Sequence, residues 1–269
     1  MARAKIAAFR LLRRWTMDAG ARGVFPSQVM RAERQEPALP VVMCMWNRPE
    51  RLTDVLEMIR SQECDTPLRL EIWNNNRRNH KRLAEIVRSA PLGGALAGVR
   101  LTTSLANIGG MGRFYILKKL RRQGLRGPAV LLDDDQDVTP RFVSDLLGRY
   151  RPHSIHGVWA WSQKTSYWDR VEVADREPAT YVGTGGCVID SSLVEQPGFF
   201  SRLPDQYLFV EDLWMSFVAT WLGWSLRKID TPYEFVQEEL NQHHQLTHVK
   251  DDFFAYLQTP EARAGWEPS

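Results

Sequence analysis

The sequence has few cysteines, no long apolar stretch and little excess of either charge, and each absence excludes a class of protein. The three cysteines, Cys44, Cys64 and Cys187, lie far apart and form no Cys-x-x-Cys pair. We therefore expect neither a disulfide framework nor a zinc site, and a reducing cytoplasm fits this pattern. No apolar stretch approaches the about 20 residues of a membrane span, and the N-terminus lacks the apolar core of a signal peptide. A net charge of only +3 gives no reason to expect a nucleic-acid partner.

What remains is the composition of an ordinary globular protein. Of the 269 residues, 43% are hydrophobic and 25% are charged, so a substantial core can form. This length suits one large α/β domain better than two small ones. Residues 1–38 differ from the rest of the chain, and we assign the globular domain to residues 39–269.

The first 38 residues predict a basic amphipathic helix and a polar linker over residues 31–38. The apolar positions have helical spacing and the arginines lie mostly opposite them: Ile6, Phe9, Leu12 and Trp15 against Arg3, Arg10, Arg13 and Arg14. Such a helix can lie on an anionic membrane surface, here through residues 1–17. It can equally pack against the body of its own protein and leave the basic face in water.

From residue 39 onward, apolar strands alternate with helical patterns. The expected strands are 40–46, 68–73, 99–102 and 128–132, and the expected helices are 49–61, 81–89 and 113–123. This alternation predicts an α/β fold with a mostly parallel central sheet flanked by helices. After residue 140 the pattern weakens, and we expect helices at 141–150 and 213–222 and strands at 158–161, 172–173, 181–189 and 225–229.

Polar residues gather where the predicted strands end. They are Asn47-Arg48, Asn74 to Asn76, the loop from Asn107 to Gly112, and Asp133 to Asp135. Ligands of parallel sheets bind at the carboxyl ends of the strands. The sequence therefore predicts one ligand site along this edge.

The aspartate triplet directly follows the apolar run of the fourth strand. Residues two apart in an extended chain point the same way, so Asp133 and Asp135 are expected to face the site together and Asp134 to point elsewhere. Adjacent carboxylates repel one another unless a cation lies between them. Oxygen ligands favour Mg²⁺ or Mn²⁺, which commonly also hold substrate phosphates. The alternative is a surface charge cluster that caps the next helix.

The glycine-rich loop precedes a predicted helix. Gly109 and Gly110 allow the backbone to approach an anion closely, and the N-terminus of the helix favours negative charge. Arg113 follows and could reach a phosphate. The same residues also suit a tight connection with a surface arginine.

Two later groups could take part in the chemistry. Glu211-Asp212 opens a predicted helix, where carboxylates favour the helix dipole, but Asp212 could also act as a general base. His243 and His244 could complete a metal shell of aspartate and histidine, or belong to a solvated tail.

From about residue 39 to residue 250 the chain resembles the inverting GT-A glycosyltransferases of family 2. The motifs occur in the same order: a first strand with a polar end, an N-x-G-G-x-G-R loop at residues 107–113, a DxD strand at residues 131–135, Gly183 to Gly186, and Glu211-Asp212. The glycine loop paired with three aspartates is similar to bacterial galactofuranosyltransferases and rhamnosyltransferases. Each motif is short, and it is their order that makes the resemblance specific.

The resemblance implies a role for each matching residue. Asp133 and Asp135 would bind the metal, Mn²⁺ or Mg²⁺, with His243 or His244 as a further ligand, and Asp212 would be the catalytic base. The nucleotide sugar would be held by Asn47, Arg48, Asn75, Asn107, Gly109, Gly110, Arg113, Asp133 and Asp134. Many members place an aspartate after the second strand to read uracil. Asn74 to Asn76 stand there in this chain. An asparagine amide can both donate and accept, so uracil remains possible, while a thymidine or other nucleotide stays open. Among the donors, a UDP-sugar is the first expectation.

The activity implied is transfer of a sugar from a nucleoside-diphosphate sugar to a hydroxyl of a glycan or lipid-linked acceptor, in polysaccharide biosynthesis. We expect a cytoplasmic enzyme, peripheral at the inner face of the membrane if the N-terminal helix binds there. One alternative is a nucleotidyltransferase, although residues 46–50 lack the glycine-rich loop typical of that class. A second is a non-catalytic membrane-associated subunit, which the retained carboxylates disfavour.

Overall fold

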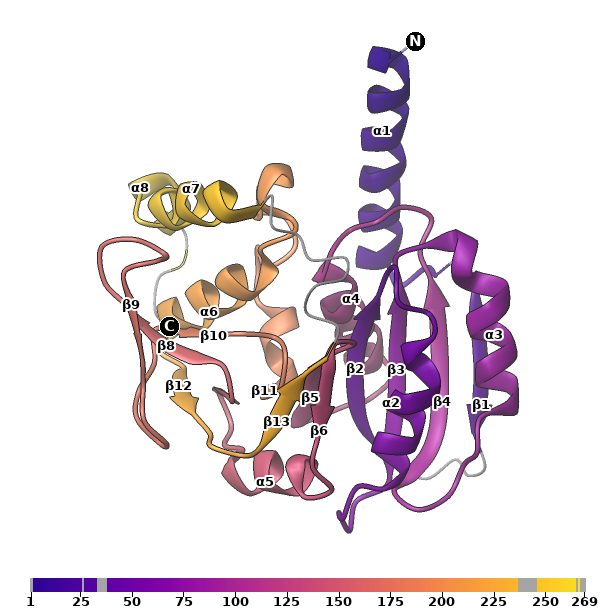
Figure 1. Ribbon diagram of the computed structural model, residues 1–269. Helices are drawn as coiled ribbons and strands as arrows, with labels where there is room; N and C mark the ends of the chain where they lie inside the picture. Colours follow the sequence, from indigo (N-terminus) through magenta and orange to yellow (C-terminus); the bar gives the residue numbers. More distant parts are fainter. Residues whose placement is uncertain (1, 26, 33–37, 237–245, 265, 267–269) are drawn as a thin grey trace.

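A computed structural model describes residues 2–25, 27–32, 38–236, 246–264 and 266. Its main sheet has eight strands in the order β1-β4-β3-β2-β5-β11-β7-β12 (Figure 1). In chain order their bounds are β1 Gln28–Ala32, β2 Leu39–Met45, β3 Leu68–Asn74, β4 Leu96–Thr103, β5 Pro128–Asp133, β7 Ser154–Gly157, β11 Cys187–Asp190 and β12 Ser225–Lys228. The strands β4, β3, β2 and β5 run parallel to one another. The predicted α/β class with its mostly parallel core is confirmed.

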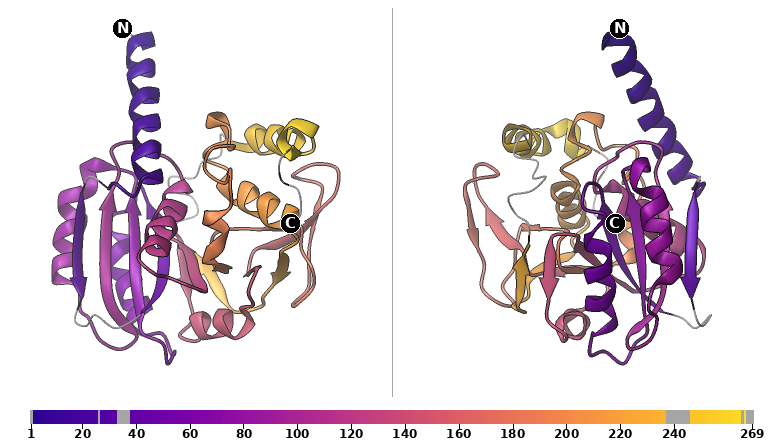
Figure 2. Two further views of the ribbon diagram at one scale, coloured as in Figure 1. Left: turned by 180° about the vertical axis from the view of Figure 1, so that it is seen from behind. Right: turned by 45° about the vertical axis from the view of Figure 1, so that its right-hand side comes forward.

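The parallel strands are buried on both faces because helices cover each side. Val41 and Met43 point into one core cluster and Val42 into the other. Helices α2 (Arg51–Arg60) and α3 (His80–Ser89) cover the first face, and α4 (Met111–Arg122) covers the second (Figures 1 and 2). This explains why the strand residues form continuous apolar runs rather than alternating with polar residues.

The second half of the chain completes the main sheet and adds two small sheets. In the main sheet, β11 pairs antiparallel with β5 and with β7, whereas β12 pairs parallel with β7. One small sheet has the order β10-β8-β9 and the other pairs β13 with β6. The remaining elements are β6 Gln136–Val138, α5 Phe142–Arg149, β8 Ala160–Gln163, β9 Arg170–Glu172, β10 Tyr181–Val182, η2 Ser191–Glu195, η3 Asp205–Tyr207, α6 Glu211–Trp221, β13 Tyr233–Phe235, α7 Thr247–Leu257 and α8 Pro260–Arg263.

Several predicted bounds differ in this half. The predicted strand 181–189 is two strands, β10 and β11, which belong to different sheets because the intervening glycines turn the chain between them. The predicted strand 158–161 begins directly after β7 ends, and it overlaps only the start of β8. These short strands carry too few residues for a periodic pattern to fix their ends.

The N-terminal residues form a helix and an edge strand. Helix α1 (Ala2–Ala21) stands out from the body in every view (Figures 1 and 2). The sheet begins before the predicted boundary at residue 39, since β1 pairs antiparallel with β4. Sequence pattern missed β1 because four of its five residues are exposed and it lacks an apolar run. In the described part of the chain, no helix is both long enough and apolar enough to cross a bilayer.

Candidate active site

A cavity of about 310 Å³ opens at the carboxyl ends of β2, β3 and β5. Its wall combines strand ends, the glycine loop, the start of α6 and the start of α7. All predicted site residues that the structure describes line it: Asn47, Arg48, Asn75, Asn107, Gly109, Gly110, Arg113, Asp133, Asp134, Asp135 and Asp212. Residues from five separate stretches of sequence therefore converge on one cavity.

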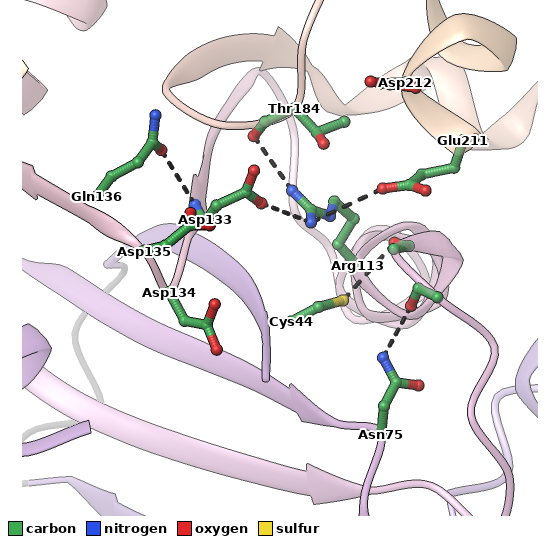
Figure 3. A network of polar contacts seen from close by, with 12 residues as sticks. Cys44, Asn75, Arg113, Asp133, Asp134, Asp135, Gln136, Thr184, Glu211 and Asp212 are labelled. Carbon is green, nitrogen blue, oxygen red and sulfur yellow. Dashed lines mark hydrogen bonds and ion pairs between the residues drawn. The ribbon is translucent and has the colours of Figure 1, made fainter. Parts of the chain in front are cut away.

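The three aspartates have different surroundings. Asp134 points away from its neighbours (Figure 3), and its Oδ1 accepts a hydrogen bond from Arg48 Nη1 at 2.7 Å. Burial raises the pKa of Asp134 to about 7. Burial and the charge of Asp133 raise the pKa of Asp135, which lies 3.3 Å from Arg48 Nη1. Asp133 is the most exposed of the three side chains, at 37%.

Asp133 and Asp135 together offer oxygen ligands of like charge. Besides burial, the charge of Asp133 raises the pKa of Asp135 because the two carboxylates repel each other. A bound cation would relieve this repulsion. This donor chemistry fits Mg²⁺ or Mn²⁺. Among the residues that the structure describes, no group of three or more His, Cys, Asp or Glu side chains is arranged to hold an ion. His243 and His244 lie outside the described residues.

Asn75 fastens the glycine loop to the end of β3. Its Oδ1 accepts hydrogen bonds from Trp73 Nε1 and the Ile108 backbone N–H, both at 3.1 Å. Its Nδ2 donates to the Gly109 carbonyl at 2.9 Å. Gly109 has φ +61°, a conformation that favours glycine. The amide predicted to read the nucleoside is thus also a structural link.

Arg113 lines the cavity and joins the aspartate triplet to the second half of the chain (Figure 3). Its side chain donates to Asp133 Oδ1 at 2.8 Å and to the Thr184 carbonyl at 3.1 Å. It also lies 3.8 Å from Glu211 Oε1. Burial alone would lower the pKa of Arg113, but the charges of Asp133 and Glu211 raise it, so the guanidinium stays charged. The arginine predicted to reach a phosphate is buried and engaged with protein groups.

The adjacent Glu211 and Asp212 differ in accessibility. Glu211 is buried beside Arg113, and this burial raises its pKa to about 7. Asp212 is half-buried; its Oδ1 accepts the Leu213 N–H at 2.8 Å, and its Oδ2 accepts a hydrogen bond from the Tyr181 hydroxyl. Both residues line the cavity at the start of α6.

Sequence reasoning missed two groups beside Asp212. Burial and the Asp212 charge raise the pKa of Tyr181 well above its usual value, so its hydroxyl remains a donor. Lys250 of α7 also lines the cavity. Burial lowers the pKa of Lys250, but the charge of Asp212 and contact with Tyr167 outweigh this and raise it. No motif marks either residue, because both reach the cavity only through the packing of the second half.

No protein-family profile and no curated protein sequence matches this chain. Solved structures do share its fold. Residues 1–349 of TarS from S. aureus, in complex with UDP, superpose with a TM-score of 0.50 at 15% identity, covering 73% of this chain and 59% of that one. A second structure of the same TarS segment gives 0.51 at 14% identity, covering 74% and 60%. This chain therefore spans less than two thirds of the TarS segment.

A mannosyltransferase from Pyrobaculum calidifontis, in complex with GDP-Man and Mn²⁺, is a more distant match. It aligns with a TM-score of 0.46 at 13% identity, over 86% of this chain and 65% of that one.

Proposed function

We propose that this protein is a metal-dependent inverting glycosyltransferase of family 2. It would transfer a sugar from a nucleoside-diphosphate sugar to a hydroxyl group of a glycan or glycolipid. One observation carries the proposal: a single cavity brings the carboxylates of Asp133 and Asp135 together with that of Asp212. The fold shared with TarS, whose structure contains UDP, supports a nucleotide ligand and favours a UDP-sugar.

The strand-end residues would bind the donor. Asp133 and Asp135 would hold Mn²⁺ or Mg²⁺, which when bound neutralises charge on the leaving diphosphate. The backbone at Gly109 and Gly110 lines the cavity and would contact phosphate oxygens, and Asn47 and Asn107 line the same wall. Further metal ligands would come from the diphosphate, or from His243 or His244.

Arg48 and Arg113 would act mainly by holding carboxylates in place. Arg48 bridges Asp134 and Asp135, and Arg113 fixes Asp133. Asp134, engaged with Arg48, would orient that arginine towards the donor. Asp133 and Asp135 would bind the metal through the oxygens that do not make these arginine contacts, Asp133 Oδ2 and Asp135 Oδ1.

Asp212 would be the general base. It would take the proton from the acceptor hydroxyl as that oxygen attacks the anomeric carbon, and the bond to the diphosphate would break on the opposite face, which inverts the centre. Glu211 suits this role less well, because it is buried against Arg113. The half-buried Asp212 is held by Tyr181 and by its own helix, so its carboxylate is oriented before the acceptor arrives.

A panel of nucleotide sugars, each with and without Mn²⁺, tests the proposal by thermal shift. We expect one donor to raise the Tm of the protein in the presence of metal by about 4 °C or more, because a ligand well above its Kd adds about 2–3 kcal/mol of stability. Asp212→Asn should keep this shift and lose sugar transfer by at least about 100-fold. Asp230→Asn, an exposed site outside the cavity, is the matched control. Full transfer by Asp212→Asn, or no metal-dependent shift with any donor, would refute the assignment.

A further inference from the structure

The C-terminal turns of α1 are packed against the protein. Thr16 and Ala19 are buried, and Gly20 lies so close to Tyr115 that a β-carbon there would be 2.9 Å from the ring. The Ala21 carbonyl accepts a hydrogen bond from Arg122 Nη2 at 2.9 Å. These contacts attach the base of α1 along α4 and fix the direction of the rest of the helix.

Beyond this base, α1 presents large apolar side chains to solvent. Leu11 is 71% exposed, Trp15 46% and Leu12 39%. They share a stretch in which every charged residue is basic: Arg3, Lys5, Arg10, Arg13 and Arg14. The first acidic residue is Asp18, within the packed turns. Exposed leucine and tryptophan beside arginines form the surface typical of a helix that binds an anionic lipid interface.

The projecting part of α1 passes the rim of the active-site cavity. Along α1 towards its N-terminus, the contacts move from Arg122 at the end of α4 to Tyr115 near its start. They then reach Phe209, over whose ring the Arg13 guanidinium lies at 5.1 Å. Phe209 lines the cavity and touches the glycine loop at Gly109. The exposed turns therefore extend from the same edge of the sheet as the cavity (Figures 1 and 2).

We infer that α1 binds an anionic membrane surface and thereby holds the cavity against the lipid, so that the acceptor hydroxyl belongs to a lipid-linked molecule. The inference about the acceptor rests on the proposed glycosyltransferase function. A second copy of the chain is a poorer partner for this helix, because two helices whose charged side chains on these turns are all basic would repel each other. A membrane with anionic headgroups matches both the charge and the apolar side chains.

Co-sedimentation with vesicles tests the membrane part. We expect the protein to bind vesicles of phosphatidylcholine mixed with phosphatidylglycerol, and to bind pure phosphatidylcholine at least about 10-fold more weakly. The double variants Leu11→Asp/Trp15→Asp and Arg10→Gln/Arg14→Gln should each lose about 10-fold or more of the binding. Val171→Asp changes a residue that is 56% exposed on β9 and should bind as the unchanged protein does. Circular dichroism verifies that each variant is folded.

Two outcomes would overturn the membrane inference. One is vesicle binding that is absent, or unchanged in both double variants. The other is a dimer, detected by light scattering without vesicles, that Leu11→Asp/Trp15→Asp dissociates; this would assign α1 to a second copy.

The acceptor part has its own readout. With vesicles made from a cellular lipid extract and a labelled donor, we expect label in the organic phase, reduced at least about 10-fold in Leu11→Asp/Trp15→Asp. Label found only in water-soluble glycan would overturn this part. The donor-induced thermal shift, measured without vesicles, should be equal in both proteins. If no donor shifts the Tm of the unchanged protein, the proposed function is refuted. The vesicle experiment would still decide whether α1 binds a membrane.

Discussion

At the scale of single residues, the carboxylate of Asp212 is fixed from two sides. The Leu213 N–H holds one oxygen and the Tyr181 hydroxyl holds the other. Tyr181 in turn lies 3.4 Å from the Tyr167 hydroxyl, and Lys250 lies over the Tyr167 ring at 5.1 Å. If Asp212 is the general base, as proposed, removing one member should affect how its carboxylate is oriented more than how the donor binds.

Tyr181→Phe tests this arrangement. We expect kcat to fall by about 10-fold or more, because the variant loses a donor that orients the general base, while KM for the nucleotide sugar stays within about 2-fold. Steady-state kinetics measures both constants. Tyr150→Phe is a matched control, since Tyr150 also bonds an aspartate, Asp190, at 3.2 Å, but lies outside the cavity. A raised KM with unchanged kcat in Tyr181→Phe would contradict the positioning role.

At the scale of elements, the glycine loop and the start of α4 are packed too closely for side chains. A β-carbon on Gly110 would lie 1.5 Å from Glu211 Oε1, and one on Gly112 would lie 2.2 Å from the Trp73 ring. The glycines are therefore required for this close packing itself. They let the start of α4 approach β3 and α6, which places Arg113 between Asp133 and Glu211.

Gly110→Ala should disrupt this approach. The new methyl group must displace Glu211 and with it the contact to Arg113, so we expect sugar transfer to fall by at least about 10-fold and Tm to fall by several degrees. Gly148→Ala lies in helix α5, where a new methyl group would meet no atom within 4 Å, and should keep full activity and an equal or higher Tm. Equal behaviour of the two variants in kinetics and calorimetry would argue against close packing at Gly110.

At the scale of the whole molecule, stability depends on a carboxylate buried in the sheet. Glu71 of β3 is 1% exposed and lies 3.2 Å from Arg69 Nε and 3.3 Å from Arg100 Nη1. Burial raises the pKa of Glu71 from 4.5 to about 7, although both arginines oppose this. The folded state binds the Glu71 proton more tightly than the unfolded state does. Protonated Glu71 therefore contributes its full share to the free energy of unfolding below about pH 4.5, and this contribution is lost as pH rises through about 7.

Glu71→Gln removes this titration. Between about pH 5 and pH 7.5, we expect the free energy of unfolding of the unchanged protein to fall by about 1–3 kcal/mol relative to that of the variant. The Tm of the unchanged protein should fall with it. Calorimetry across this range measures both proteins, and Glu85→Gln, an exposed change on α3, should follow the unchanged protein. Parallel Tm curves for all three proteins would show that Glu71 does not titrate in this window.

The sequence predicted the parts of the molecule that have a local signal. The strands β2, β3 and β5 are marked by apolar runs that end in polar residues, and these ends converge on the cavity. Tyr181 and Lys250 could not be predicted, because short strands and a late helix bring them to Asp212 through long-range packing. The engagement of Arg113 with Asp133 likewise depends on how closely α4 approaches β5, which no single motif encodes.

The edge strand β1 has a consequence for any shortened form of this protein. By pairing with β4 it covers the hydrogen-bonding groups along one side of the sheet, and its own exposed residues include Gln28 and Arg31. A chain cut at residue 39 would lose this cover along with α1 and leave β4 as a bare edge, open to strand exchange between molecules. We therefore expect the N-terminal segment also to guard against aggregation. Its effect on solubility must be separated from the proposed membrane binding by point substitutions rather than by truncation.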